Sequence, residues 1–159
     1  MTDDQTRIHL KRCVELAAEA LAAGDEPFGS VLVDAHGRVC AEDRNRIAAG
    51  DATRHPELAL AQWAAAHMSA RERAAATVYT SGEHCPMCAA AHAWVGLGRI
   101  VYASSSAQLV AWLDAMGAAR PPVTPWPIGD IAPGVPVAGP VAPFDTQVRA
   151  LHRRHHGIE

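Results

Sequence analysis

The stretch SGEHCPMC at residues 81–88 places two cysteines three positions apart, with a proline directly after the first. Upstream, HPE at residues 55–57 has a similar arrangement, in which a potential metal ligand precedes a proline. Thiolates and imidazole are preferred zinc ligands, and three protein ligands with an open fourth position are typical of catalytic zinc. The sequence therefore predicts that His55, Cys85 and Cys88 bind one zinc ion per chain.

The two prolines predict how these ligands are presented. A residue before proline is pushed out of the α region, and proline itself fits the first position of a helix. His55 is then expected just before a helix that ends before Arg71, with Glu57 in its first turn. Cys85 is expected just before a helix over residues 86–97. Cys88 would lie in that helix's first turn, where the helix dipole favours a thiolate.

Two other interpretations of the cysteine pair are open. A redox pair needs a thioredoxin-like context, which the HPE element does not supply. A closed structural zinc site needs a fourth ligand, for which His84 and His92 are near in sequence. The glutamate two residues after His55 favours catalysis, because H-x-E followed by C-x-x-C is a signature of zinc deaminases. Glu57 is then expected to carry protons from water to a ring nitrogen and to the departing ammonia.

The rest of the chain alternates between helix and strand patterns, which predicts a single α/β domain over residues 1–159. The expected helices are 3–23, 106–116 and 144–154, and the expected strands are 28–34, 39–41, 76–80 and 99–103, the first two as a hairpin. Eight of the eleven prolines lie between residues 121 and 143. No helix is expected there, but an extended wrap with a short edge strand at 135–137. The wrap could be a lid over a pocket, a subunit contact or a surface connection.

Composition excludes several classes of partner. The 14 Lys plus Arg against 17 Asp plus Glu, for a net charge of −3, argue against a protein that binds a nucleic-acid backbone. The acidic start predicts no signal peptide, and no apolar run approaches the ~20 residues of a membrane helix. Cys13 and Cys40 are expected in the core, and unpaired Cys85 and Cys88 favour a reducing cytoplasm. The expected partner is a small molecule.

Three segments together resemble one known family. EPFGSVLV (26–33), RHPE (54–57) and YTSGEHCPMC (79–88) are similar to segments of guanine deaminases, within the cytidine and deoxycytidylate deaminase superfamily. The resemblance covers roughly residues 5–115. It implies a three-layer α/β/α fold with a five-stranded mixed sheet, one zinc per subunit and a homodimer. The implied reaction is hydrolytic removal of an amine from a free base such as guanine, isoguanine, cytosine or 5-azacytosine.

The resemblance also implies roles for individual residues. His55, Cys85 and Cys88 would be the zinc ligands and Glu57 the proton carrier. Substrate-binding positions would be Asn45 on the base edge, Phe28 and Trp94 in the pocket wall, and Asp114 as a second acidic group.

Three features depart from the family pattern. His84 stands where a proline is usual, Asn45 is one residue nearer the histidine, and residues 151–159 carry no aromatic side chain. The choice of base is therefore left open. A tRNA adenosine deaminase is the alternative enzyme, and a non-catalytic zinc-binding interaction domain is the alternative of another class.

Overall fold

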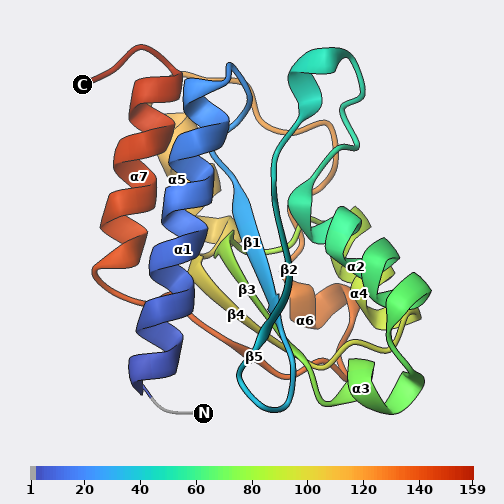
Figure 1. The fold of residues 1–159 in the computed structure, drawn as a ribbon. Helices are drawn as coiled ribbons and strands as arrows, with labels where there is room; N and C mark the ends of the chain where they lie inside the picture. The colour runs from blue at the N-terminus through green and yellow to red at the C-terminus, as the bar shows by residue number, and fades with distance from the viewer. Residues whose placement is uncertain (1–2) are drawn as a thin grey trace.

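A five-stranded mixed sheet forms the centre of the computed structural model, which describes residues 3–159 (Figure 1). The strand order is β2-β1-β3-β4-β5. β1 pairs antiparallel with β2 and with β3, whereas β3, β4 and β5 are parallel. The strands are β1 (Gly29–Val33), β2 (Val39–Arg44), β3 (Thr77–Gly82), β4 (Arg99–Ser104) and β5 (Val137–Ala138). The predicted hairpin and five-stranded mixed sheet are confirmed.

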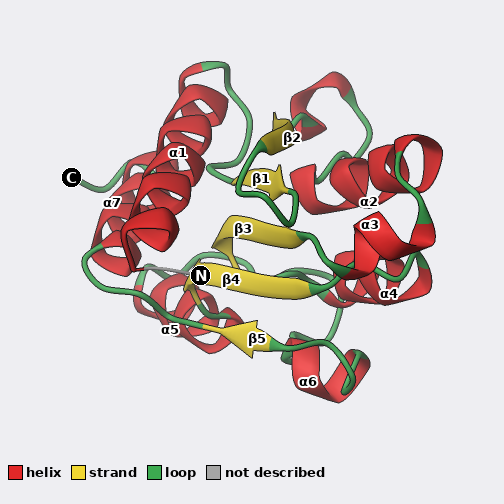
Figure 2. Cartoon of the chain, turned by 60° about the horizontal axis from the view of Figure 1, so that its bottom comes forward, coloured by secondary structure: helices red, strands yellow, loops and turns green. Residues whose placement is uncertain are grey.

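Helices cover both faces of this sheet, which gives three layers (Figure 2). One face carries α1 (Asp3–Ala22), α5 (Ser106–Ala115) and α7 (Phe144–His155). The other carries α2 (Pro56–His67), α3 (Ala70–Ala74), α4 (Pro86–Trp94) and α6 (Ile128–Ile131). A short 3-10 helix, η1 (Ile47–Ala49), precedes α2.

The apolar core is divided between the two faces by the alternation of side chains along each strand. Val31 and Val33 of β1 pack with Leu10 of α1 on one face. Leu32, between them, packs with Leu60 of α2 on the other. All five residues of β1 are buried, as is usual for a strand covered on both faces.

Gly29, at the start of β1, is required by close packing. A Cβ at this position would lie 2.6 Å from the carbonyl oxygen of Cys13 and would also clash with Leu16 Cβ. Real Cβ atoms are not found so near backbone oxygen, so a larger residue would push α1 away from the sheet. This contact fixes the position of β1 against α1, and with it the positions of Phe28 and Ser30.

Two predictions about helices need correction. The helix expected to reach almost to Arg71 ends at His67, and a separate helix α3 follows. Ser69 starts α3 through a capping box, in which its side chain accepts from the backbone N–H of Glu72 and Glu72 caps it in return. The Pro-rich segment, expected to contain no helix, contains the single turn α6. The segment does supply an edge strand, β5, but at Val137–Ala138, so it shares only Val137 with the predicted 135–137.

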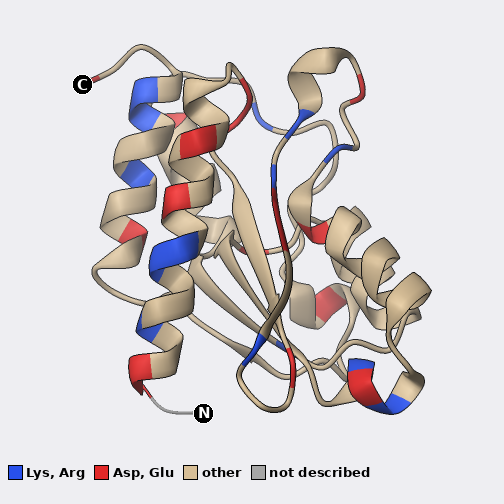
Figure 3. Cartoon of the chain, viewed as in Figure 1, with Lys and Arg blue, Asp and Glu red and all other residues tan. Residues whose placement is uncertain are grey.

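Charged side chains of both signs are spread over the outer helices and loops (Figure 3). Arg12 of α1, for example, lies within ion-pair distance of Glu15, Glu19 and Glu42. Within residues 3–159, no helix has the length and apolar character needed to cross a bilayer.

Candidate active site

The first part of the site lies where α2 begins. His55 is the residue before the helix, with extended backbone angles of φ −86° and ψ 141°, and Pro56 occupies the first helical position. Glu57 follows in the first turn and is only 6% exposed. His55 is held in an extended conformation before the proline, whereas Glu57 is helical. Because of this change in backbone conformation, both side chains can lie at one site, as predicted.

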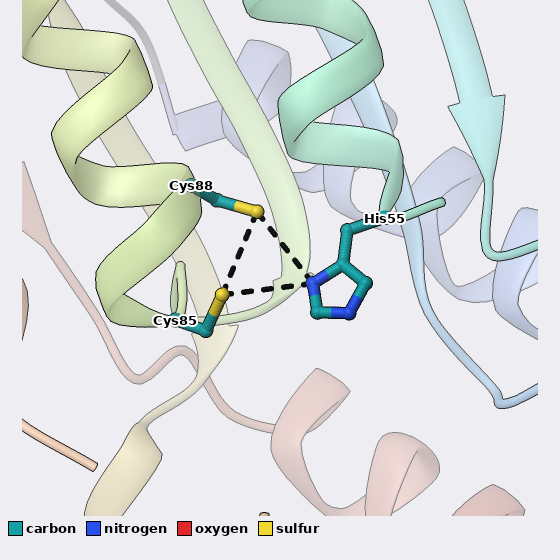
Figure 4. A group of neighbouring side chains, drawn as sticks. All are labelled: His55, Cys85 and Cys88. Atoms are coloured by element: carbon teal, nitrogen blue, oxygen red, sulfur yellow. Dashed lines mark hydrogen bonds between the residues drawn. The ribbon is translucent and has the colours of Figure 1, made fainter. Parts of the chain in front are cut away.

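The second part has the same construction at the start of α4. Cys85 precedes the helix with extended angles of φ −67° and ψ 167°, and Pro86 opens the helix. Cys88 lies in the first turn and is fully buried. Figure 4 shows both sulfur atoms, from the N-terminal end of α4, pointing toward the imidazole of His55 at the start of the neighbouring helix α2.

The three donor atoms are spaced for one zinc ion. His55 Nδ1 lies 3.6 Å from Cys85 Sγ and 3.6 Å from Cys88 Sγ, and the two sulfurs are 3.6 Å apart. Tetrahedral zinc with ordinary Zn–S and Zn–N bond lengths separates such donors by about 3.5–3.8 Å. The three predicted ligands thus form a candidate zinc site with one side open.

The charges at this site also favour a cation. A hydrogen bond from the Cys88 thiol, together with His55, lowers the pKa of Cys85 to about 4. Hydrogen bonding to Cys85 in turn raises the pKa of His55 to about 9. The thiolate of Cys85 stabilises a proton on the imidazole of His55, and a metal ion bound between these groups can replace that proton.

Glu57 is a buried carboxyl group beside these donors. Burial raises its pKa to about 7, and the nearby charge of His55 acts in the opposite direction. Its Oε1 lies 3.2 Å from the hydroxyl of Ser30 and 3.4 Å from that of Thr80. A carboxyl group that titrates near neutral pH can both accept and return a proton under physiological conditions.

Ser30 and Thr80 are site residues that the sequence analysis missed. Their hydroxyl oxygens are 2.8 Å apart, and Thr80 donates to the carbonyl of Gly82 at 2.9 Å. Both side chains are buried. The sequence offered one signal for them: each is a polar residue in a predicted strand, close to a predicted motif.

A cavity of about 460 Å³ is lined by His55 and Cys85, two of the three donors, and by Glu57. Phe28 also lines it. The outer wall comes from α5, with Leu109, Val110 and Leu113, and from the chain between Ala119 and Pro125. This part of the Pro-rich segment therefore covers the cavity, which supports the lid interpretation. His152 and His156 of the C-terminal part also line it and were not predicted.

Glu83 attaches this wall to the cysteine-bearing loop. Its carboxylate accepts the backbone N–H of Ser106 at 2.9 Å and that of Ile128 at 2.8 Å. These two donors lie at the starts of α5 and α6, where free N–H groups favour a negative charge. One side chain thereby holds the start of α5, which lines the cavity, and the start of α6.

The remaining predicted substrate contacts lie elsewhere. Asn45 is buried, and its Oδ1 accepts the backbone N–H groups of Glu26 and Ile47, so it braces two loops beside the cavity. Trp94 is 89% exposed at the end of α4 and is not in the cavity wall. Asp114 pairs with Arg120 at 2.7 Å on the surface, and only Arg120 reaches the cavity. In this structure neither Trp94 nor Asp114 therefore lines the cavity.

His84, which replaces the usual proline, is fully buried against the edge of the His92 ring, at a centroid distance of 5.3 Å. Neither of its ring nitrogens has a hydrogen-bond partner among the described residues. His92 donates from Nε2 to the backbone carbonyl of Gly98 at 2.7 Å. Neither histidine belongs to the three-donor cluster, so a fourth protein ligand is not supplied by them.

Comparison with known proteins agrees with this site. A sequence model of the cytidine and deoxycytidylate deaminase zinc-binding region matches residues 3–104. The chain belongs to this family of zinc-dependent deaminases. Its zinc cofactor and its hydrolytic deaminase class, both predicted from the sequence, are thereby confirmed.

Particular relatives act on bases. The chain is 29% identical over 113 residues to a probable cytosine deaminase of Schizosaccharomyces pombe, covering 71% of this chain and 68% of that protein. It is 37% identical over 97 residues to guanine deaminase of Bacillus subtilis, covering 60% and 62%. A solved guanine deaminase of Nitrosomonas europaea superimposes with a TM-score of 0.68 at 25% identity, covering 94% and 83%. Relatives also include tRNA-specific adenosine deaminases.

Proposed function

We propose that this protein removes the exocyclic amine from a free nucleobase or a similar amino-heterocycle, with release of ammonia. The observation that carries the proposal is the position of Glu57. Its buried carboxyl group, with a pKa of about 7, lies beside the three zinc donors and lines the cavity. A non-catalytic zinc-binding domain would have no use for such a group.

The residues account for the proton transfers of this hydrolysis. A zinc ion held by His55, Cys85 and Cys88 would supply the Lewis acidity that makes water nucleophilic near neutral pH. Glu57 takes a proton from the attacking water and delivers it to the ring nitrogen beside the reacting carbon. It then takes the second proton, from the hydroxyl now attached to that carbon, and passes it to the amine, which leaves as ammonia while the carbon keeps the oxygen as a carbonyl. Ser30 and Thr80 hold the carboxylate during these steps.

A small ring suits the cavity better than an RNA loop. Leu109, Val110 and Leu113 form an apolar wall, and the segment from Ala119 to Pro125 covers it. Arg120, the arginine at this cavity, is already paired with Asp114 through two hydrogen bonds. Binding an anticodon loop requires several phosphate contacts from Lys and Arg, and the chain has more acidic than basic residues. The tRNA adenosine deaminase remains the second candidate because such enzymes are among the relatives.

The decisive experiment measures ammonia release from guanine, isoguanine, cytosine, 5-azacytosine and adenine, beside an anticodon stem-loop at low and moderate salt. We expect turnover of at least one free base by zinc-loaded protein and none by Cys88→Ala, which should also lack zinc. Salt-sensitive deamination of the RNA, with no activity on any free base, would establish the tRNA alternative instead.

The proposal includes a homodimer in the cytoplasm. Trp94 is 89% exposed and lies beside exposed Ala93 on α4, and large exposed apolar groups of this kind are typical of contact surfaces. A second copy of the chain is the proposed occupant, because dimers are usual in the family that the sequence resembles. Sedimentation should show a dimer for the wild type and a shift toward monomer for Trp94→Asp. A monomeric wild type would contradict this part.

A further inference from the structure

A histidine from the C-terminal helix lines the cavity from the helix layer opposite the zinc donors. α7 packs with α1 on one face of the sheet, whereas α2 and α4 lie on the other (Figure 2). His152 is 3% exposed, yet its side chain forms part of the cavity wall. No other element of the α1–α7 layer except α5 contributes to that wall.

The ring of His152 is held by aromatic neighbours. The Phe28 ring meets it edge-on, with centroids 5.0 Å apart and an interplanar angle of 67°. Trp112 of α5 lies on another side, at 6.0 Å. Among residues 3–159, no hydrogen-bond partner engages its ring nitrogens, although buried polar groups are nearly always hydrogen-bonded. The ring is therefore fixed in place but keeps its hydrogen-bonding capacity.

The imidazole is uncharged at neutral pH. Burial, together with the neighbouring His155 and His156, lowers the pKa of His152 to about 4. A neutral imidazole offers one N–H donor and one nitrogen acceptor. Such a group suits the edge of an uncharged heterocycle, which carries carbonyl oxygens, ring nitrogens and N–H groups.

We propose that His152 is a specificity-determining residue, which hydrogen-bonds the edge of the amino-heterocycle while Phe28 packs beside it. This rests on the proposed function, because it assumes that the cavity binds the base to be deaminated. A base with a polar group at the matching position pairs with the imidazole. A base without one leaves the imidazole unpaired in a buried site and binds less well.

The test uses two substitutions that separate hydrogen bonding from packing. His152→Phe keeps a ring against Phe28 and Trp112 but removes both nitrogens, and His152→Gln keeps one amide donor and acceptor. The control His155→Phe lies on the same helix but outside the cavity wall. Zinc-loaded forms of all four proteins are assayed for kcat and KM on the same five bases.

For His152→Phe we expect kcat/KM on the preferred base to fall about ten- to a hundredfold, which is the effect of leaving one buried hydrogen-bonding group unpaired. The loss should differ among bases, so that the order of preference changes, and it should appear mainly in KM. His152→Gln should retain part of the preference, and His155→Phe should match the wild type. Isothermal titration of the preferred base into Glu57→Gln, with and without His152→Phe, should show the same loss in Kd.

The possible results are distinguishable. An unchanged order of preference in His152→Phe, whether or not overall activity falls, would overturn the role of His152 and leave the deaminase intact. If His152→Phe does not fold, the same criterion is applied to His152→Gln. Wild-type protein that deaminates no free base would refute the proposed function itself, and the role of His152 with it.

Discussion

At the scale of single residues, the site depends on one carboxyl group that must move protons. Replacing Glu57 by Gln keeps the size and most hydrogen-bonding capacity of the side chain but removes its ability to accept a proton. We expect zinc content and fold to be retained and turnover to fall by about 10²–10⁴ or more, since the same group serves several transfers. Ammonia release and metal analysis on the same sample provide the check. Loss of zinc from this variant would make Glu57 a ligand instead of a proton carrier.

The hydroxyl of Ser30 is expected to position that carboxyl group. It lies 3.2 Å from Glu57 Oε1 and is itself anchored at 2.8 Å by Thr80. In Ser30→Ala the carboxylate loses one hydrogen bond that fixes its rotamer, so kcat should fall about tenfold, while zinc content and KM stay near wild-type values. Thr80→Val removes the anchor and should have a smaller effect in the same direction. Wild-type kcat in both variants would show that the two hydroxyls serve packing alone.

At the scale of elements, Glu83 joins three parts of the chain. Its carboxylate accepts N–H groups at the starts of α5 and α6, at 2.9 and 2.8 Å. Hydrogen bonds to a charged group contribute roughly 1.5–3 kcal/mol each to stability, and Glu83→Gln weakens both without changing shape. We expect the free energy of unfolding, measured with urea, to fall by about 2 kcal/mol. KM should rise because the outer wall loosens. Unaltered stability would show that both helix starts find other acceptors.

The elements also show how far the sequence alone could predict the structure. The proline at the first position of each helix allowed the positions of His55 and Cys85 to be inferred, because proline restricts the backbone of the residue directly before it. The capping box of Ser69 was equally local and could have been read. The turn α6 could not, because its start depends on Glu83, 45 positions away. The substrate-binding roles of Trp94 and Asp114 came from the resemblance alone, which does not say what surrounds those residues in this chain.

At the scale of the whole molecule, acid is expected to weaken the fold through its buried histidines, of which His152 is one. The pKa of His152 is lowered from 6.5 to about 4. Between these values the unfolded chain binds a proton that the folded chain does not, so stability falls as pH falls. From this group the free energy of unfolding should drop by up to about 3 kcal/mol between pH 6.5 and 4.

Urea unfolding of the wild type and of His152→Gln across this range isolates that contribution. Loss of zinc and protonation of carboxylates affect both proteins, so they cancel in the difference between them. As the solution becomes more acidic, the free energy of unfolding of His152→Gln should rise relative to that of the wild type. A difference that is constant from pH 7 to pH 4 would contradict the expectation.

The cavity described above is assembled from two portions of the chain. The family match ends at residue 104, and every zinc donor, Glu57, Ser30 and Thr80 lie before that point. Leu109, the segment from Ala119 to Pro125 and His152 come after it, and they line the cavity together with Phe28 and Met87 from the first portion. The groups that would bind zinc and move protons thus lie in the first portion, whereas the cavity wall draws on both. Libraries aimed at a new substrate can vary cavity-lining positions of the second portion, such as Leu109 and Val123, while the zinc donors and Glu57 are left untouched.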